Sequence, residues 1–126
     1  MGVYCARWFA KIAGVRRGEV WRVAFDPVAG SEQAKTRPAV IVQRDSANAA
    51  SPTTIVCPLV DANGQHGNLL NAGVRRGAGG ARKDSLVVCN QVRTVDRIRL
   101  RGDALGTLPA ETMQLVDDGL RAILDL

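Results

Sequence analysis

The chain has 126 residues, of which 46% are hydrophobic and 23% charged, and its 17 Lys+Arg against 12 Asp+Glu give a formal charge of +5. This composition is typical of one ordinary globular domain and excludes disordered, collagen-like and disulfide-scaffold chains. No stretch approaches the ~20 apolar residues of a membrane helix, and no secretory signal is recognisable. We therefore expect a cytoplasmic protein with no membrane partner.

The first half of the chain predicts short strands separated by polar loops. Residues 1–15 resemble an N-terminal extension, and residues 16–126 are expected to form a single domain. Apolar residues alternate with other residues along a first strand, and a continuous β-branched run indicates a second strand buried on both faces. In chain order we expect a strand at 20–25, a loop at 28–37, a strand at 39–42, a polar turn at 45–52 and a strand at 53–60.

The second half of the chain predicts a weaker strand at 69–74, a flexible glycine-rich segment at Gly77–Gly80, a strand at 85–95 and a short turn at 96–100. Pro58 marks an edge or a bulge, because proline has no N–H for a ladder. A closing helix begins near Thr107 or Leu108, with Pro109 in its first turn. Its apolar stripe comprises Met113, Val116, Leu120, Ile123 and Leu124. The pattern indicates a mainly β fold: a small curled antiparallel sheet or SH3-like barrel with a C-terminal helix.

Charge is unevenly distributed along the chain. Residues 1–102 hold 16 basic and 7 acidic side chains, whereas residues 103–126 hold 1 and 5. Such a basic body is typical of a surface that binds phosphates, and equally of a solvated surface. All five aromatic residues lie at or before Phe25, so an RNA-binding surface would rely mainly on charge and polar contacts.

Residue types suited to metal or nucleophilic chemistry are scarce. Cys5, Cys57 and Cys89 are widely spaced and are interpreted as structural thiols, and the single histidine, His66, has no ligand partner at a suitable spacing. No metal or other cofactor is therefore expected. The remaining candidate is the polar loop before the buried strand, where Arg37 could hold a phosphate with two hydrogen bonds or simply bind Glu32 or a loop carbonyl.

Several colinear segments resemble the MazF/PemK family of toxin endoribonucleases. They are Arg17-Gly18-Glu19-Val20-Trp21, Gly30-Ser31-Glu32-Gln33, Thr36-Arg37-Pro38-Ala39-Val40, Ser51-Pro52-Thr53, Ile55-Val56-Cys57-Pro58 and Gln91-Val92-Arg93-Thr94. The resemblance runs from about Arg16 to Leu126. Each segment alone is a weak signal, whereas their common order and spacing are specific.

The resemblance implies a MazF/CcdB-like SH3-like barrel, a homodimer, a cognate MazE-like antitoxin and metal-independent cleavage of single-stranded RNA. In the family's reaction, the RNA 2′-hydroxyl attacks the adjacent phosphate and leaves a cyclic phosphate and a 5′-hydroxyl. Arg37 matches the arginine before the proline and would stabilise charge on the phosphorane, with Glu32 and Ser31 as further catalytic candidates. The RNA-binding candidates are Gln33, Lys35, Asn48, Thr53, Asn90, Gln91 and Arg93.

Two positions depart from the family pattern. Val60 stands where a catalytic Thr or Ser is frequent, and Asn90 stands where the PemK branch has Asp. Valine transfers no proton, and an amide is no base near neutral pH. Two alternatives to a nuclease therefore follow: a non-catalytic relative that binds RNA or antitoxin, and a gyrase-inhibiting toxin of the same fold.

Overall fold

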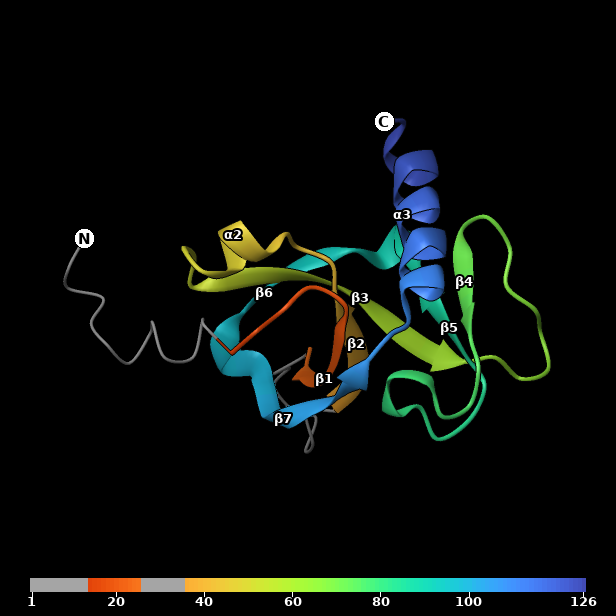
Figure 1. Ribbon diagram of the computed structural model, residues 1–126, viewed down its shortest axis with the longest axis horizontal. Coiled ribbons are helices and arrows are strands. Elements are labelled where there is room, and N and C mark those ends of the chain that lie inside the picture. The colour runs from red at the N-terminus through yellow and green to blue at the C-terminus, as the bar shows by residue number, and fades with distance from the viewer. Residues whose placement is uncertain (1–13, 26–35) are drawn as a thin grey trace, which may run out of the picture.

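The computed structural model describes residues 14–25 and 36–126 (Figure 1). Its strands are β1 (Glu19–Ala24), β2 (Thr36–Ile41), β3 (Thr53–Asp61), β4 (Asn71–Val74), β5 (Ser85–Val88), β6 (Arg93–Asp96) and β7 (Leu100–Thr107). Its helical elements are α2 (Asp45–Asn48), α3 (Ala110–Leu124) and the 3-10 turns η2 (Ala78–Gly80), η3 (Cys89–Gln91) and η4 (Arg97–Arg99). The predicted mainly β fold with a C-terminal helix is confirmed.

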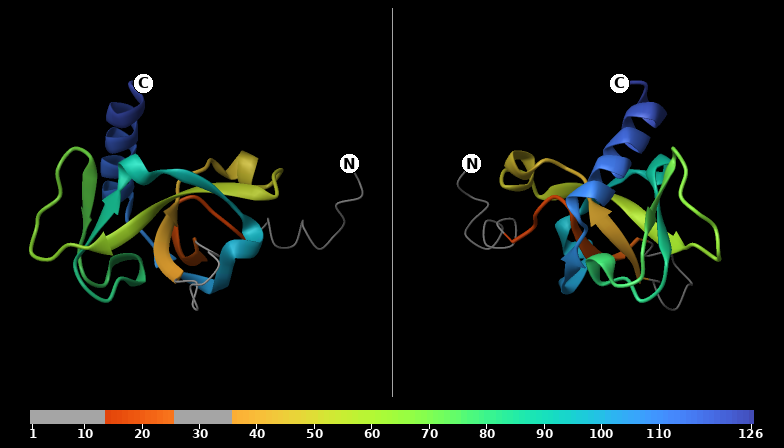
Figure 2. Two further views of the ribbon diagram at one scale, coloured as in Figure 1. Left: turned by 180° about the vertical axis from the view of Figure 1, so that it is seen from behind. Right: turned by 45° about the vertical axis from the view of Figure 1, so that its right-hand side comes forward.

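The described strands form one antiparallel sheet in the order β4-β5-β3-β2-β1-β7, with β6 paired to β3. The beginning of β3 pairs with β6 and its end pairs with β5, so this long strand belongs to two parts of a curled sheet. Figures 1 and 2 show β1, β2, β6 and β7 curling around one end of β3 while β4 and β5 extend from the other. The predicted curled sheet is therefore observed.

The predicted strand at 85–95 is wrong in one respect, because η3 divides it into β5 and β6. Leu59 is paired with Val87 and Val56 with Arg93, so two residues of β3 face the five residues 88–92. Pro58 lies in this gap and has no N–H to offer a neighbouring strand. The predicted irregularity at Pro58 thus falls where the opposite strand is interrupted.

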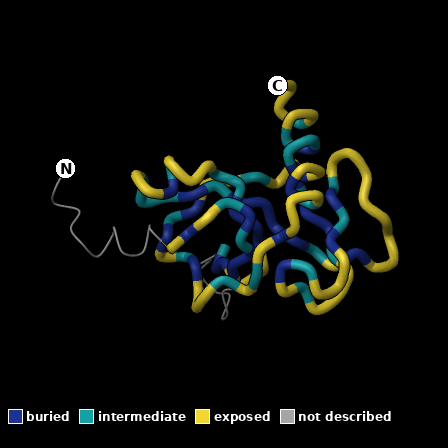
Figure 3. The backbone as a smooth tube through the Cα atoms, viewed as in Figure 1, coloured by how far each residue is buried: buried dark blue, intermediate teal, exposed yellow. Residues whose placement is uncertain are grey.

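Two hydrophobic clusters pack on opposite faces of β1, β2 and β3. The inner core lies on the face that β6 and β7 also line, and it contains Val15, Trp21, Val23, Ala39, Ile41, Val56, Val95 and Leu100. The helix-side core joins the other face to β4, β5 and α3, and it includes Val20, Val40, Cys57, Leu59, Val87, Cys89, Met113 and Val116. Neighbouring residues of one strand enter different cores, as expected for strands buried on both faces. Figure 3 shows the buried stretches of the backbone at the centre of the domain.

The helix α3 covers the helix-side core with Met113 and Val116 buried and Leu120 and Ile123 partly buried. Leu124 was predicted to be on the same stripe but is exposed, because it lies in the last turn beyond the core. The cap position belongs to Pro109, not to Thr107 or Leu108. Leu108 instead packs in the helix-side core.

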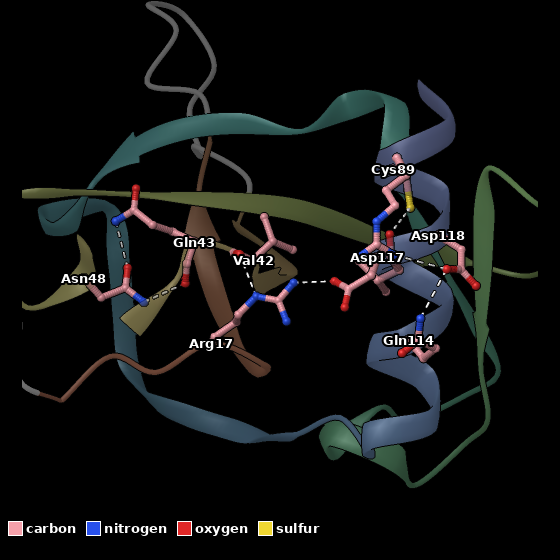
Figure 4. Close-up of polar contacts among 10 residues, drawn as sticks. Arg17, Val42, Gln43, Asn48, Cys89, Gln114, Asp117 and Asp118 are labelled. Atoms are coloured by element: carbon pink, nitrogen blue, oxygen red, sulfur yellow. Dashed lines mark hydrogen bonds and ion pairs between the residues drawn. The ribbon is translucent and has the colours of Figure 1, made fainter. Parts of the chain in front are cut away.

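Arg17 ties three parts of the domain together. Its Nε donates to the Val42 carbonyl at 2.9 Å, its Nη2 pairs with Asp117 of α3, and its backbone N–H donates to Asp45 Oδ1 at 2.7 Å. Figure 4 shows the guanidinium between Val42 and Asp117. This contact fixes the approach to β1 against α3 and the segment after β2.

Three further expectations are corrected by the structure. Val15, assigned to the extension, is buried in the inner core, so the packed domain includes it; residues 1–13 lie outside the described part. Gly79 is buried in η2, so the segment predicted to be flexible is a compact turn. Strand β7 was not predicted, because it is a mostly exposed edge strand with two glycines. Among the described helices, none is long and apolar enough to cross a membrane.

Candidate functional site

Arg37 is the second residue of β2 and not the last residue of a loop, which corrects the predicted boundary. Its backbone partner on β1 is Val23, a residue of the inner core. Cross-strand partners share a face of the sheet, so Arg37 follows Ile41 and Ala39 along the inner-core face. Arg37 itself is exposed. A rigid strand thus carries its guanidinium at the rim of the inner core.

Phe25 and Arg93 lie at the same rim. Phe25 directly follows β1, two residues after Val23, and is partly buried against the inner core. Arg93, the first residue of β6, places its guanidinium carbon 5.2 Å from the centroid of the Phe25 ring. This distance is that of a cation–π contact. We call Phe25, Arg37 and Arg93 the arginine rim.

The two cations of the arginine rim, Arg37 and Arg93, form no ion pair with a carboxylate in the described part of the chain. The ion pairs there join other residues: Arg17 to Asp117, Lys83 to Asp61 and Arg121 to Asp118. Phe25 and Thr36 flank the segment that carries Ser31, Glu32, Gln33 and Lys35, and these four residues lie outside the described part. The arginine rim is suited to hold an anion supplied by a ligand.

Val60 lies on β3, two residues after Pro58. The β2–β3 ladder pairs Ile41 with Val56 and Ala39 with Pro58, and it ends before Arg37 and Val60. Val60 is half-buried and pairs with Leu86 of β5. This position of β3 therefore supplies an apolar side chain and no proton-transfer group.

Asn90 and Gln91 share one short segment with Arg93. Both are exposed and belong to η3, the turn that interrupts the strand opposite Pro58. Arg93 follows two residues later and pairs with Val56 of β3. The structure therefore brings three of the predicted RNA-binding residues together on one surface segment that reaches the arginine rim.

Asn48 has a different environment from the predicted one, because it is 1% exposed. Its Oδ1 accepts a hydrogen bond from Gln43 Nε2 at 2.9 Å, and its Nδ2 donates to the Gln43 carbonyl at 3.0 Å (Figure 4). Its Oδ1 also accepts a hydrogen bond from Thr54 Oγ1 at 2.7 Å. Arg97, also buried, donates from Nη2 to the Asn48 carbonyl at 2.7 Å. These residues form the Asn48 cluster. Their hydrogen bonds hold the segment after β2, and the Asn48 side chain is not on the surface of the domain.

Thr53 begins β3, at the end of the strand away from Val60. It is half-buried, and its Oγ1 lies 3.0 Å from Ser51 Oγ. Thr53 pairs with Asp96, the last residue of β6, whereas Arg93 of the arginine rim is the first residue of β6 and pairs with Val56. Thr53 and Val56 are three positions apart, which is about 10 Å of extended strand. Thr53 therefore lies at the other end of β6 from Arg93.

The buried cysteines and the histidine lie apart from this surface chemistry. Burial, followed by the nearby Cys89, raises the pKa of Cys57 to about 12, and burial also raises the pKa of the Cys89 thiol. Both are free thiols in the helix-side core, as expected for structural cysteines, while Cys5 lies outside the described part. His66 is exposed. No group of three or more His, Cys, Asp or Glu in the described ranges could hold a metal ion.

Phe25 is the site residue that the sequence did not single out. Its place at the end of an alternating apolar strand indicated core packing, and its contact with Arg93 depends on a strand almost seventy residues later. Only the fold joins these two segments. The available signal was the confinement of all aromatic residues to the first 25 positions.

Comparison with known proteins gives one consistent relationship. Residues 16–124 match the family described as PemK-like, MazF-like toxins of type II toxin–antitoxin systems. A curated relative, Endoribonuclease MazF of Staphylococcus epidermidis, is 36% identical over 112 residues, which cover 89% of this chain and 92% of the relative.

Solved structures agree with the fold. MazF of Deinococcus radiodurans (Form-I) superposes with a TM-score of 0.69 at 25% identity, covering 89% of this chain and 97% of that one. A chain of the MazE–MazF structure (Form-II) from the same organism superposes with a TM-score of 0.73 at 23% identity, covering 90% and 97%.

Proposed function

The chain belongs to the family of PemK-like, MazF-like toxins of type II toxin–antitoxin systems, and on this premise we propose that it is an endoribonuclease that cleaves single-stranded RNA at specific sequences without a metal ion. The observation that carries the proposal is Arg37. It is exposed at the end of a strand that packs into two cores, and no described carboxylate neutralises it. A cation held in this way is prepared for a phosphate before RNA arrives.

In the proposed reaction, a base removes the proton of the RNA 2′-hydroxyl while its oxygen attacks the adjacent phosphorus. The bond from phosphorus to the 5′-oxygen breaks, and this oxygen takes up a proton. The products are a 2′,3′-cyclic phosphate and a 5′-hydroxyl. Arg37 stabilises the added negative charge of the phosphorane with its guanidinium N–H groups.

Glu32 is the proposed base, because it is the carboxylate nearest to Arg37 in the sequence, and Ser31 is proposed to orient the reacting phosphate. Val60 cannot share this work. The segment that contains Ser31 and Glu32 lies between Phe25, which is two residues after Val23, the strand partner of Arg37, and Thr36, which directly precedes Arg37. The proposal therefore assigns proton transfer to this segment and charge stabilisation to β2.

RNA binding is proposed to extend from the arginine rim over η3. Arg93 and Phe25 offer a cationic and apolar face on which a base can stack, and Asn90 and Gln91 offer exposed amides for base edges. Gln33 and Lys35 are proposed to contact the same RNA. Thr53 remains a prediction that the position of β3 does not support within one chain.

We also propose a homodimer in the cytoplasm whose activity is blocked by a MazE-like antitoxin. One structural neighbour is a MazE–MazF structure, which supports a partner of this kind. An acidic antitoxin segment would compete with RNA for the cations of the arginine rim. The opposing candidate is a non-catalytic relative that binds RNA or antitoxin, favoured by the valine at position 60 and the asparagine at position 90.

The test is incubation of the purified chain with a long RNA of mixed sequence in EDTA, with mapping of the new ends. Discrete cuts that carry 5′-hydroxyls and cyclic phosphates, and that disappear in Arg37→Ala, are the expected result. An intact RNA that the folded chain still binds would favour the non-catalytic candidate. Inhibition of gyrase supercoiling by a chain that leaves RNA intact would favour the gyrase alternative.

A further inference from the structure

The loop between β4 and β5 carries a second concentration of positive charge. Its basic side chains are Arg75, Arg76, Arg82 and Lys83, and all four are exposed. Arg22 of β1, also exposed, lines the same pocket as Arg82 and Lys83. Two carboxylates accompany these five cations: Asp61 pairs with Lys83 at 2.9 Å, and Asp84 Oδ1 accepts the backbone N–H of Arg76 at 2.8 Å. The surface is therefore basic beyond its internal pairing.

The backbone of this loop is preorganised by glycines. A Cβ on Gly80 would lie 2.4 Å from the Leu105 carbonyl oxygen, and a Cβ on Gly106 would lie 2.6 Å from the carbonyl carbon of Gly79. Loop and β7 backbones thus touch at a distance that a side chain on either would prevent. The Gly77 N–H donates to the Ala81 carbonyl at 2.8 Å and closes the turn. Figures 1 and 2 show the loop folded against β7.

A pocket of about 450 Å³ lies between this loop and the sheet. Its apolar lining includes Val20, Leu59 and Leu105, and its charged lining is Arg22, Asp61, Arg82 and Lys83. Pro38 forms part of its wall and directly follows Arg37 in β2. The pocket and the arginine rim therefore meet at one segment of β2, from opposite faces of the sheet.

We infer that this surface is a phosphate-binding track for the RNA that flanks the cleaved bond. The track comprises Arg22, Arg75, Arg76, Arg82 and Lys83 and lies outside the arginine rim. None of its arginines forms an ion pair with another described residue. Because the glycine-docked loop is already folded, binding does not require ordering of its backbone. The inference rests on the proposed function, since RNA held at Arg37 supplies the flanking phosphates.

RNA fits the track better than an acidic peptide does. Phosphates recur along a strand of RNA and suit guanidinium groups spread along a loop, whereas a bound peptide normally adds apolar anchors. Leu105, at 36% exposure, is the exposed large hydrophobic residue of the pocket. The track is expected to bind phosphates without reading sequence, because arginine contacts to phosphate carry no sequence information.

The test compares two charge-matched double variants of the full chain. Arg76→Gln with Arg82→Gln removes two cations of the track, and Arg44→Gln with Arg121→Gln removes two exposed cations of other elements. Binding is measured by fluorescence anisotropy from low to high salt, with RNAs of 30 and 6 nucleotides of mixed sequence. Both RNAs carry 2′-O-methyl groups, which remove the nucleophile and prevent cleavage.

For the track variant, binding of the long RNA should weaken about tenfold at low salt, and the slope of log K against log salt should become shallower by about 1.4. The short RNA and the control variant should change little. Polyglutamate is measured in the same assay as a probe for an acidic peptide. The inference is overturned if the two variants behave alike, if the short RNA is weakened as much as the long one, or if the track variant loses binding of polyglutamate while its binding of the long RNA is unchanged. Cleavage of unmodified RNA by the parent chain is scored separately, so failure of the nuclease proposal is distinguishable from failure of the track.

Discussion

The Asn48 cluster and the arginine rim contain similar residue types but use them differently. In the Asn48 cluster, amides, a hydroxyl and an arginine form hydrogen bonds with one another inside the domain. At the arginine rim, Arg37 is exposed and has no described carboxylate partner, and Arg93 contacts an aromatic face. Polar groups whose bonds are made internally stabilise the fold, whereas those exposed on a rigid support remain available to a ligand.

The largest expected difference between the two regions is the loss of stability when Arg97 is removed. Its side chain is fully buried and donates to the Asn48 carbonyl at 2.7 Å, so Arg97→Ala leaves both a cavity and an unpaired acceptor. We expect a loss of about 3 kcal/mol in the free energy of unfolding, measured with urea. The exposed Arg75→Ala should change it by less than about 0.5 kcal/mol. Equal effects would show that burial does not separate the two kinds of arginine.

The next effect concerns Asn48 itself. Asn48→Ala removes three side-chain hydrogen bonds of the cluster and should lower the free energy of unfolding by about 2 kcal/mol. Asn90→Ala, at an exposed position, is the matched control and should have little effect on stability. An Asn48→Ala variant as stable as the parent chain would contradict the structural role of these hydrogen bonds.

The sequence accounts for these two regions unequally. Alternating and continuous apolar runs predicted strands at 20–25, 39–42 and 53–60 and a closing helix, because burial on a regular element leaves a periodic pattern. The structure has these strands at 19–24, 36–41 and 53–61 and the helix as α3. Arg37 was identified through its neighbours in sequence. The buried environment of Asn48 was not predicted, because its partners, Thr54 and Arg97, are set by tertiary packing, which a local pattern does not record.

The same limit explains β7 and the glycine loop. An exposed edge strand leaves no apolar alternation, so β7 was not predicted. Glycines in a sequence indicate a flexible backbone, yet Gly79, Gly80 and Gly106 allow the backbones of the loop and of β7 to pack in direct contact. The contact between Phe25 and Arg93 likewise exists only after the sheet has curled.

A smaller effect concerns Cys57, which tests the interior with pH. Its pKa is raised to about 12 in the folded chain, so the thiol stabilises the fold fully below its ordinary pKa of 9.0 and loses that contribution as the pH rises toward 12. At pH 10 the contribution lost is about 1.4 kcal/mol. Between pH 7 and pH 10, Cys57→Ala should therefore lose about this much less stability than the parent chain in urea unfolding. Parallel pH profiles would contradict the burial of this thiol.

The smallest effect is expected for the ion pair between Arg17 and Asp117, which is partly exposed. Their side chains are 32% and 28% exposed, so Asp117→Asn should lower the free energy of unfolding by about 1 kcal/mol or less, and by less still at high salt. The control is Asp118→Asn, whose pair with Arg121 is more exposed and longer, at 3.5 Å. A salt-independent loss of several kcal/mol would place the Arg17 pair with the buried cluster instead.

The most direct test measures cleavage rate and folding stability on the same preparations of Arg37→Ala and Asn48→Ala. Arg37→Ala should lose about 10²- to 10³-fold in cleavage rate while its free energy of unfolding stays within about 0.5 kcal/mol of the parent. Asn48→Ala should lose stability and keep both its rate per folded molecule and its cleavage sites. An Arg37→Ala variant that cuts RNA at the parent rate would contradict the account.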